Sequence, residues 1–340
     1  MAGAWLFPCR RVTLAPPLFP KGPPVDTNAP RPPSAGDAAP PFLLLGGHAK
    51  DLGGGFVVRR LLPALQRRSI GPFVFFDHFG PVTVEPASEY DVRPHPHIGL
   101  ATVTYLFEGA ITHRDSLGSV CEIAPGAINW MTAGRGIVHS ERRPERLRSA
   151  AYVNHGLQLW AALPEAHAEV EPSFVHTAAE AIPEIHDGRG VRVRVLVGSA
   201  FEATSPVATL APTLYLDILL PAGAGLLLPP LAEEMAVYAV EGACRLEDGA
   251  GRPADLPAGM LAIPQAPGPV RLQEATGSGP ARCVVVGGAP LDGPRHIWWN
   301  FVSSRKERIE QAADDWDAMR MGVVPGDPER IPLPERHFKR

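Results

Sequence analysis

From Phe42 onward, β-branched and aromatic residues form short runs that Gly and Pro interrupt about every 8 to 12 residues. Examples are the apolar runs at 56–58, 73–76 and 101–107. This spacing is typical of a sandwich or barrel of short antiparallel strands. A different pattern follows at 303–319, where a serine precedes charged residues and apolar residues spaced three or four apart. The sequence therefore predicts an all-β protein with a short C-terminal helix.

An internal repeat predicts how these strands are organised. The hexapeptide Tyr-Leu-Phe-Glu-Gly-Ala at 105–110 recurs as Tyr-Ala-Val-Glu-Gly-Ala at 238–243, which is an offset of 133 residues. A second turn glycine follows each hexapeptide at the same distance, Gly126 in the first copy and Gly259 in the second. We infer that one β-barrel has been duplicated in tandem.

Composition adds the predicted boundaries. The first 41 residues hold 11 of the 39 prolines and few long aliphatic residues, a composition that cannot bury enough surface to fold. We expect 1–41 to be a disordered leader, or the result of a start codon assigned too early. The first barrel is expected at 42–170, the second at 171–320 with its closing helix, and a tail at 321–340.

Two pairs of metal-binding side chains lie at strand spacing in the first barrel. His95 and His97 form one pair, and His139 and Glu141 form the other. Residues two apart in a strand point to the same face, so two facing strands would bring the four side chains together. Three imidazoles and one carboxylate without a thiolate suit a catalytic first-row ion with open coordination positions. The alternative is that each pair has only a structural role at a strand end or on the surface.

The second copy lacks these ligands. At the repeat offset, the three histidines correspond to Leu228, Pro230 and Leu272, and only Glu141 has an identical counterpart, Glu274. One carboxylate cannot hold a metal ion by itself. We therefore predict one metal ion per chain, in the first barrel.

Other side chains are assigned by strand alternation. Phe76, Trp130 and Met131 are expected to shape a substrate pocket beside the metal, and Gln158 and His155 are candidates to face the same cavity. The charged cluster at 113–115 is interpreted as a solvated strand end, with the cavity mouth as the alternative.

Charge and cysteine content exclude several classes of protein. The net charge of −4 provides no basic field for nucleic acid, and no apolar run is long enough to cross a bilayer. The four cysteines form no C-x-x-C pair, so we expect reduced thiols and a cytoplasmic location. These cysteines are Cys9, Cys121, Cys244 and Cys283.

The motifs resemble those of the cupin superfamily and, more closely, those of pirin, a bicupin family. The resemblance covers 42 to about 320. It rests on these segments in order: Gly71-Pro72-Phe73, Asp77-His78-Phe79-Gly80-Pro81, His95-Pro96-His97, Leu106-Phe107-Glu108-Gly109, Gly134-Arg135-Gly136-Ile137-Val138-His139-Ser140-Glu141 and Gly156-Leu157-Gln158-Leu159-Trp160. One departure is Ala101, which stands where cupins usually carry a glutamate.

The resemblance implies a mononuclear iron held by His95, His97, His139 and Glu141, and a metal-free second barrel. It also implies flavonol 2,3-dioxygenase activity on quercetin-like substrates in some members, with a small aromatic substrate and dioxygen as reactants. In others it implies an iron-dependent, redox-sensing regulatory protein that binds a protein partner. Iron is favoured by the resemblance alone, because manganese, nickel, cobalt and copper suit the same ligands. Glu141 is the candidate base that takes the proton of a substrate hydroxyl.

Overall fold

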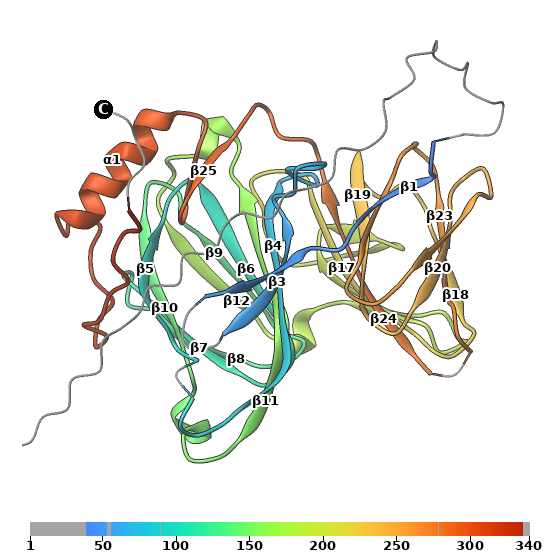
Figure 1. Cartoon of the computed structure of the whole chain (residues 1–340), viewed down its shortest axis with the longest axis horizontal. Helices are drawn as coiled ribbons and strands as arrows, with labels where there is room; N and C mark the ends of the chain where they lie inside the picture. Colours follow the sequence, from blue (N-terminus) through green and yellow to red (C-terminus); the bar gives the residue numbers. More distant parts are fainter. Residues whose placement is uncertain (1–38, 53–55, 89, 278, 336–340) are drawn as a thin grey trace, which may run out of the picture. The chain divides into compact units, whose positions relative to one another are not determined.

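The computed structural model describes residues 39–52, 56–88, 90–277 and 279–335. These residues are mostly strands, with one α-helix near the C-terminal end (Figure 1). The predicted all-β fold with a short C-terminal helix is confirmed. The expected leader at 1–41 lies outside the described residues apart from 39–41. Among the described residues, no helix is both long and apolar enough to cross a bilayer.

The first barrel consists of a seven-stranded and a four-stranded antiparallel sheet. In spatial order the larger sheet contains β12 (Ser173–Thr177), β9 (Ile128–Thr132), β6 (Leu100–Glu108), β11 (Tyr152–Ala162), β4 (Phe73–Val84), β3 (Val57–Leu62) and β2 (His48–Asp51). The smaller sheet contains β5 (Val92–His97), β10 (Ile137–Arg142), β7 (Ile111–Asp115) and β8 (Val120–Ile123).

The second barrel repeats this arrangement, as the internal repeat predicts. Its larger sheet contains β1 (Phe42–Leu45), β22 (Leu261–Pro264), β19 (Glu234–Glu241), β24 (Ala281–Gly288), β17 (Thr213–Leu220), β14 (Arg192–Val197) and β13 (Glu184–His186). Its smaller sheet contains β18 (Gly225–Leu228), β23 (Val270–Glu274), β20 (Cys244–Glu247) and β21 (Pro253–Leu256). Short elements complete the described residues: β15 (Ser199–Ala200), β16 (Ala203–Thr204), β25 (His296–Trp298), β26 (Phe301–Ser303), α1 (Lys306–Asp317) and the 3-10 helices η1 (Glu145–Leu147), η2 (Glu165–His167) and η3 (Ala179–Ala181).

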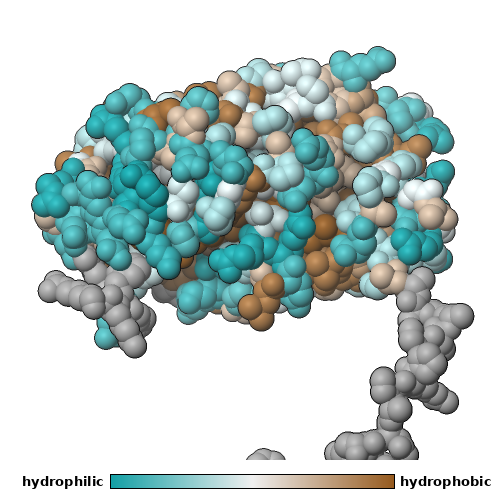
Figure 2. Space-filling view, turned by 90° about the horizontal axis from the view of Figure 1, so that it is seen from above, coloured by the Kyte–Doolittle hydropathy of each residue, from teal (hydrophilic) through white to brown (hydrophobic). Residues whose placement is uncertain are grey.

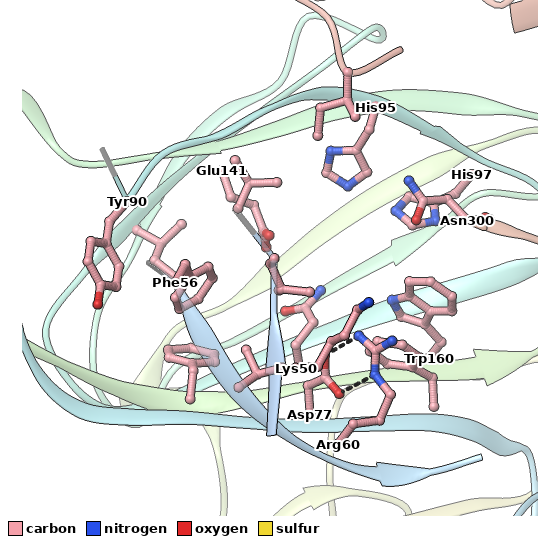
Figure 3. Close-up of a pocket in the computed structure, with 18 of the residues that line it drawn as sticks. Lys50, Phe56, Arg60, Asp77, Tyr90, His95, His97, Glu141, Trp160 and Asn300 are labelled. Atoms are coloured by element: carbon pink, nitrogen blue, oxygen red, sulfur yellow. Dashed lines mark hydrogen bonds and ion pairs between the residues drawn. The ribbon is translucent and has the colours of Figure 1, made fainter. Parts of the chain in front are cut away.

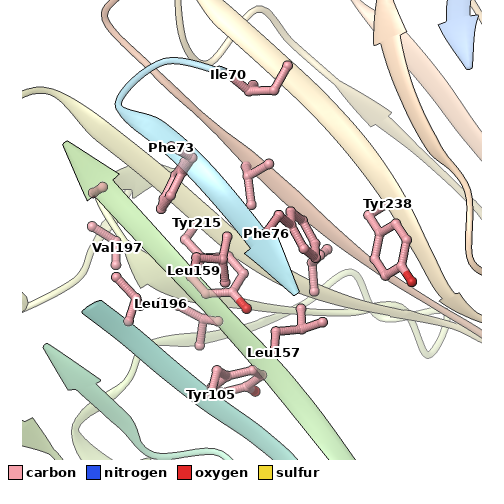
Figure 4. Packing of buried hydrophobic residues seen from close by; sticks show 14 of the residues in the cluster. Ile70, Phe73, Phe76, Tyr105, Leu157, Leu159, Leu196, Val197, Tyr215 and Tyr238 are labelled. Carbon is pink, nitrogen blue, oxygen red and sulfur yellow. The ribbon is translucent and has the colours of Figure 1, made fainter. Parts of the chain in front are cut away.

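One buried cluster joins the larger sheets of the two barrels (Figure 4). Phe76 of the first barrel packs edge-on against Tyr238 of the second, with ring centroids 5.0 Å apart. Tyr105 and Tyr215 make a similar contact at 5.9 Å. The larger sheet of the first barrel is thus buried on both faces. For this reason its strands carry apolar residues at adjacent as well as alternate positions.

Three segments lie in the other barrel from the one expected. Strand β12 falls in the range expected for the second barrel, yet it pairs with β9 of the first. Strand β1 begins the range expected for the first barrel, yet it pairs with β22 in the larger sheet of the second. At the other end, the apolar face of α1, with Ile309 and Trp316, is buried against Ile98 and Val138 of the first barrel. The C-terminal segment therefore returns to the barrel that contains the candidate metal ligands.

The second barrel uses the positions equivalent to the ligands for packing and turn formation. Leu228 and Leu272 are fully buried in its core. Glu274 instead accepts hydrogen bonds from the backbone of Gly223, Thr276 and Gly277. These bonds, led by one from the Thr276 hydroxyl, lower the pKa of Glu274 to about 2. This carboxylate thus caps a turn.

Candidate metal centre and substrate cavity

Three histidines converge inside the first barrel. The antiparallel register of β5 and β10 places His95 directly opposite His139, and His97 lies two residues further along β5 on the same face. The Nε2 atoms of His97 and His139 are 3.1 Å apart, and one ring nitrogen from each of the three histidines lies within 4.8 Å of the others. All three side chains are buried.

The second ring nitrogen of each histidine is held by a neighbouring group. Nδ1 of His95 donates to the carbonyl of Arg93 at 2.9 Å, and Nδ1 of His97 donates to the carbonyl of Asn300 at 3.0 Å. These two bonds leave each Nε2 as a lone-pair donor directed at the other rings. Burial lowers the pKa of His95 to about 4 and the pKa of His97 well below its ordinary value, so both imidazoles are neutral.

His139 is held by another side chain. Its Nδ1 lies 3.4 Å from Nδ1 of His113, whose Nε2 lies 3.0 Å from a carboxylate oxygen of Asp115. The other oxygen of Asp115 accepts the backbone amides of Leu117 and Ser119, which fixes the carboxylate in the hairpin turn. His113 and Asp115 are therefore buried groups that orient a predicted ligand, and the interpretation of 113–115 as a solvated strand end is wrong for these two residues.

Glu141 lies in the same cavity, but its carboxylate does not join the group of three nitrogens. The register of β10 against β5 shifts between His139 and Glu141, and such an irregularity redirects a side chain. Oε1 of Glu141 accepts a long hydrogen bond of 3.4 Å from the Thr104 hydroxyl. Burial raises the pKa of Glu141 above that of an exposed glutamate.

His95 and His97 open onto a cavity of about 590 Å³ (Figure 3). Phe75 and Trp160 form one wall, with their rings stacked 4.0 Å apart and nearly parallel, and Trp160 packs its edge against His97. The larger set of lining residues includes Phe56, Phe79, Tyr90, Lys50, Arg60, Asp77, Gln158, Trp299 and Asn300. The size is that of a site for a molecule of two or three rings.

Strand register explains which predicted pocket residues line this cavity. Gln158 lines it, whereas Phe76 and Trp130 point to the other side of the larger sheet, into the core shared with the second barrel. Met131 packs in the buried cluster that contains Phe75 and Trp160, but it does not itself line the cavity. His155 does not line the cavity either: its Nε2 lies 2.7 Å from that of His78, next to the second barrel.

A row of polar side chains crosses the larger sheet on the cavity side. Arg60 on β3 forms two hydrogen bonds with Asp77 on β4, of 2.8 and 2.7 Å. Asp77 is paired with Gln158 on β11, which lies opposite Thr104 on β6. The Thr104 hydroxyl also lies 2.8 Å from Gln158, so this row connects Arg60 to the hydroxyl that contacts Glu141.

Several of these groups were not predicted from the sequence. Asp77 carried a usable signal, because a carboxylate directly after the apolar run 73–76 must be paired if that strand is buried. Lys50 lies on the edge strand β2 and Arg60 on its neighbour β3. No sequence motif surrounds either residue, so neither could be predicted to line the cavity. The contact of Asn300 with His97 is made by a backbone carbonyl 203 residues away, for which the sequence gives no signal.

The donor set fits a divalent first-row metal ion. Three neutral imidazoles converge with their outer nitrogens already held, which is the arrangement that fixes ring orientation and tautomer in metal sites. The carboxylate of Glu141 is two residues from His139 and faces the same cavity. Three nitrogen donors with room beside them match an open, catalytic site better than a closed structural one.

Comparison with known proteins identifies the family. The pirin family model matches residues 55–161, and the model of the pirin C-terminal cupin domain matches 215–322. A pirin-like protein of Caulobacter vibrioides is 44% identical over 296 residues, which cover 86% of this chain and 99% of that protein.

Solved structures show the same architecture. A quercetin 2,3-dioxygenase from Acinetobacter baumannii aligns with a TM-score of 0.78 and 32% identity, covering 88% of this chain and 97% of that one. A bacterial pirin from Escherichia coli in complex with nickel(II) aligns with a TM-score of 0.55 at 18% identity, covering 73% and 99% respectively, a likeness of fold. With both family models matched in order and a relative that aligns over nearly its whole length, the chain belongs to the pirin family of bicupins.

Proposed function

We propose that this chain is a metal-dependent dioxygenase that acts on flavonol-type, quercetin-like aromatic substrates. The observation that carries the proposal is the convergence of His95, His97 and His139 at the end of a cavity with aromatic walls. The similarity to a structure described as a quercetin 2,3-dioxygenase supports the substrate class.

One divalent ion per chain would be held by the three histidines, with Glu141 as the fourth ligand. Iron(II) is our first candidate, and manganese, nickel, cobalt and copper suit the same donors. The nickel(II) in the related Escherichia coli protein agrees with a site that accepts several metals. When bound, the ion would supply Lewis acidity toward a substrate oxygen and bring dioxygen beside the substrate.

The side chains of this chain would position the substrate and move its proton. Phe75 and Trp160 would hold the aromatic ring and exclude water from one side. Glu141 would accept the proton of the reacting hydroxyl, helped by the burial that raises its pKa. Thr104 would keep the carboxylate of Glu141 oriented in the cavity.

The test is oxygen consumption by the full chain after reconstitution with each of the five metals, with quercetin as the substrate. We expect turnover with at least one metal, and none in the metal-free protein or in His97→Ala. If the parent binds metal but consumes no oxygen with any of the five, the dioxygenase proposal fails.

The rival proposal is an iron-dependent regulatory protein that binds a protein partner. Such a partner would need a docking surface, and the face in Figure 2 mixes hydrophilic and hydrophobic residues in small groups. The convergence of three histidines at a cavity with aromatic walls is the more specific observation, so we favour the enzyme.

A further inference from the structure

The substrate cavity is lined by more cationic than acidic groups, although the whole chain has a net charge of −4. Four cations and two carboxylates line it: Lys50, Arg60, Arg142, Arg143, Asp77 and Glu141. An excess of positive charge in a cavity of an acidic protein attracts an anion where that charge is not already neutralised by ion pairs. The aromatic walls indicate a substrate with a ring, and the charge of the cavity indicates in addition whether that substrate is an anion.

Three of these cations already have partners. Arg142 forms ion pairs with Asp327 and Glu329, and Arg143 donates to two backbone carbonyls. Arg60 uses Nε and Nη2 for Asp77, and its guanidinium lies 4.3 Å above the ring of Phe75. These contacts hold the arginines in place.

Lys50 differs from the arginines because it has no hydrogen-bond or ion-pair partner among the described residues. It lies on the edge strand β2, opposite Val58 of β3, while His48 lies opposite Arg60. Lys50 and Arg60 are thus diagonal neighbours on one face of the hairpin, and both line the cavity. Figure 3 shows both side chains reaching into it from the side opposite the ring of His95.

We propose that the natural substrate is an aromatic acid, a phenol that carries a carboxylate or another anionic group. Lys50 binds this group at the rim of the cavity, with Arg60 beside it, while the phenolic hydroxyl faces the histidines. The ring between these two ends lies along Phe75 and Trp160. This inference rests on the proposed function for the use of this cavity, and it replaces the uncharged flavonol with an anionic phenol as the natural substrate. The charge preference can be measured without any turnover.

The experiment compares acids with their methyl esters, which keep the catechol ring and lose the charge. The probes are 3,4-dihydroxybenzoate, 3,4-dihydroxyphenylacetate and caffeate, whose carboxylates lie at increasing distances from the hydroxyls. Dissociation constants are measured by calorimetry on the full chain loaded with Zn²⁺, which does no redox chemistry. Binding is therefore read out whether or not the protein is a dioxygenase.

For at least one probe we expect the acid to bind about three- to tenfold more tightly than its ester, the range for one charge-assisted contact at a partly exposed site. Raising the salt concentration should reduce this preference. Lys50→Gln should bring the ratio close to one, Lys50→Glu should invert it, and Lys50→Arg should retain it.

Lys306→Gln is the matched control, because Lys306 is an exposed lysine at the start of α1, outside the cavity. It should leave the ratio unchanged. The proposal is overturned if the parent shows no preference for any of the three acids, or if Lys50→Gln keeps the preference of the parent. Oxygen consumption that fails while the acid preference is present would refute the dioxygenase and leave this inference standing.

Discussion

Replacement of His113 by phenylalanine tests whether the buried histidine behind His139 contributes to metal binding. The variant removes the acceptor for Nδ1 of His139 but keeps a flat ring, which retains the stack on Phe174 at 4.0 Å. Asp115 keeps its two backbone hydrogen bonds, so the hairpin turn should persist. The change removes one hydrogen bond of one ligand, together with the bond between His113 and Asp115.

The expected loss of metal affinity can be placed within a known range. Removing an outer-shell partner of a metal ligand typically costs about 10- to 100-fold in affinity. The bond from His139 to His113 is long, at 3.4 Å, while His95 and His97 keep their bonds of 2.9 and 3.0 Å. We therefore expect the lower end, about tenfold, which corresponds to about 1.4 kcal/mol.

The assay is a competition titration of Zn²⁺ and Fe²⁺ against a chromophoric chelator, on the parent and the variant. Thermal unfolding of the metal-free proteins separates any loss of stability from the loss of affinity. Phe174→Leu is the control, because it disturbs the stack and leaves the hydrogen bonds of His113 in place. An unchanged dissociation constant in His113→Phe, or an equal loss in Phe174→Leu, would refute the reasoning.

Three further predictions concern other parts of the chain. Elemental analysis should find one tightly bound metal ion per chain, and two would contradict the loss of ligands in the second barrel. Glu141→Gln should reduce turnover per bound metal by about 10²- to 10⁴-fold while His97→Ala loses the metal itself, and parent-like turnover per metal in Glu141→Gln would exclude proton transfer by this residue. Burial lowers the pKa of His78 to about 3 and that of His155 to about 4. Below about pH 6.5 the unfolded chain therefore binds more protons than the folded chain, so the free energy of unfolding should fall as the pH is lowered from 6.5 toward 4. Chemical denaturation of the metal-free protein should show this slope, to which the buried His95 and His97 also contribute. His155→Gln should make the slope shallower, and an unaltered slope would argue against a contribution from His155.

The sequence predicted those parts of the site that depend on spacing within one strand. His95 and His97 converge with His139 because residues two apart share a face and because the register of two neighbouring strands aligns the pairs. The duplication could also be predicted from the sequence, because it was inferred from turn glycines that recur at the same spacing. Such a glycine is required by the conformation of the backbone itself. Gly109, for example, has φ +91°, and a Cβ there would lie 2.6 Å from the carbonyl oxygen of Val153.

Alternation failed where a sheet is buried on both faces. Phe75 and Phe76 are both apolar and both buried, and nothing in the sequence distinguishes the one that faces the cavity from the one that faces the second barrel. Trp130 was misplaced for the same reason. Which face of the sheet packs against the second barrel is a property of the tertiary structure, and the sequence alone does not reveal it.

The return of the C-terminal segment to the first barrel makes the order of chain synthesis matter. The carbonyl that orients His97 belongs to Asn300, and the apolar surface around Ile98 is covered by α1. A nascent chain that has not yet reached these residues holds an imidazole without its acceptor and an exposed apolar patch. If the histidines bind a metal ion as proposed, we expect stable metal binding only when translation is nearly complete. A prematurely terminated chain would expose the apolar surface that chaperones and proteases recognise.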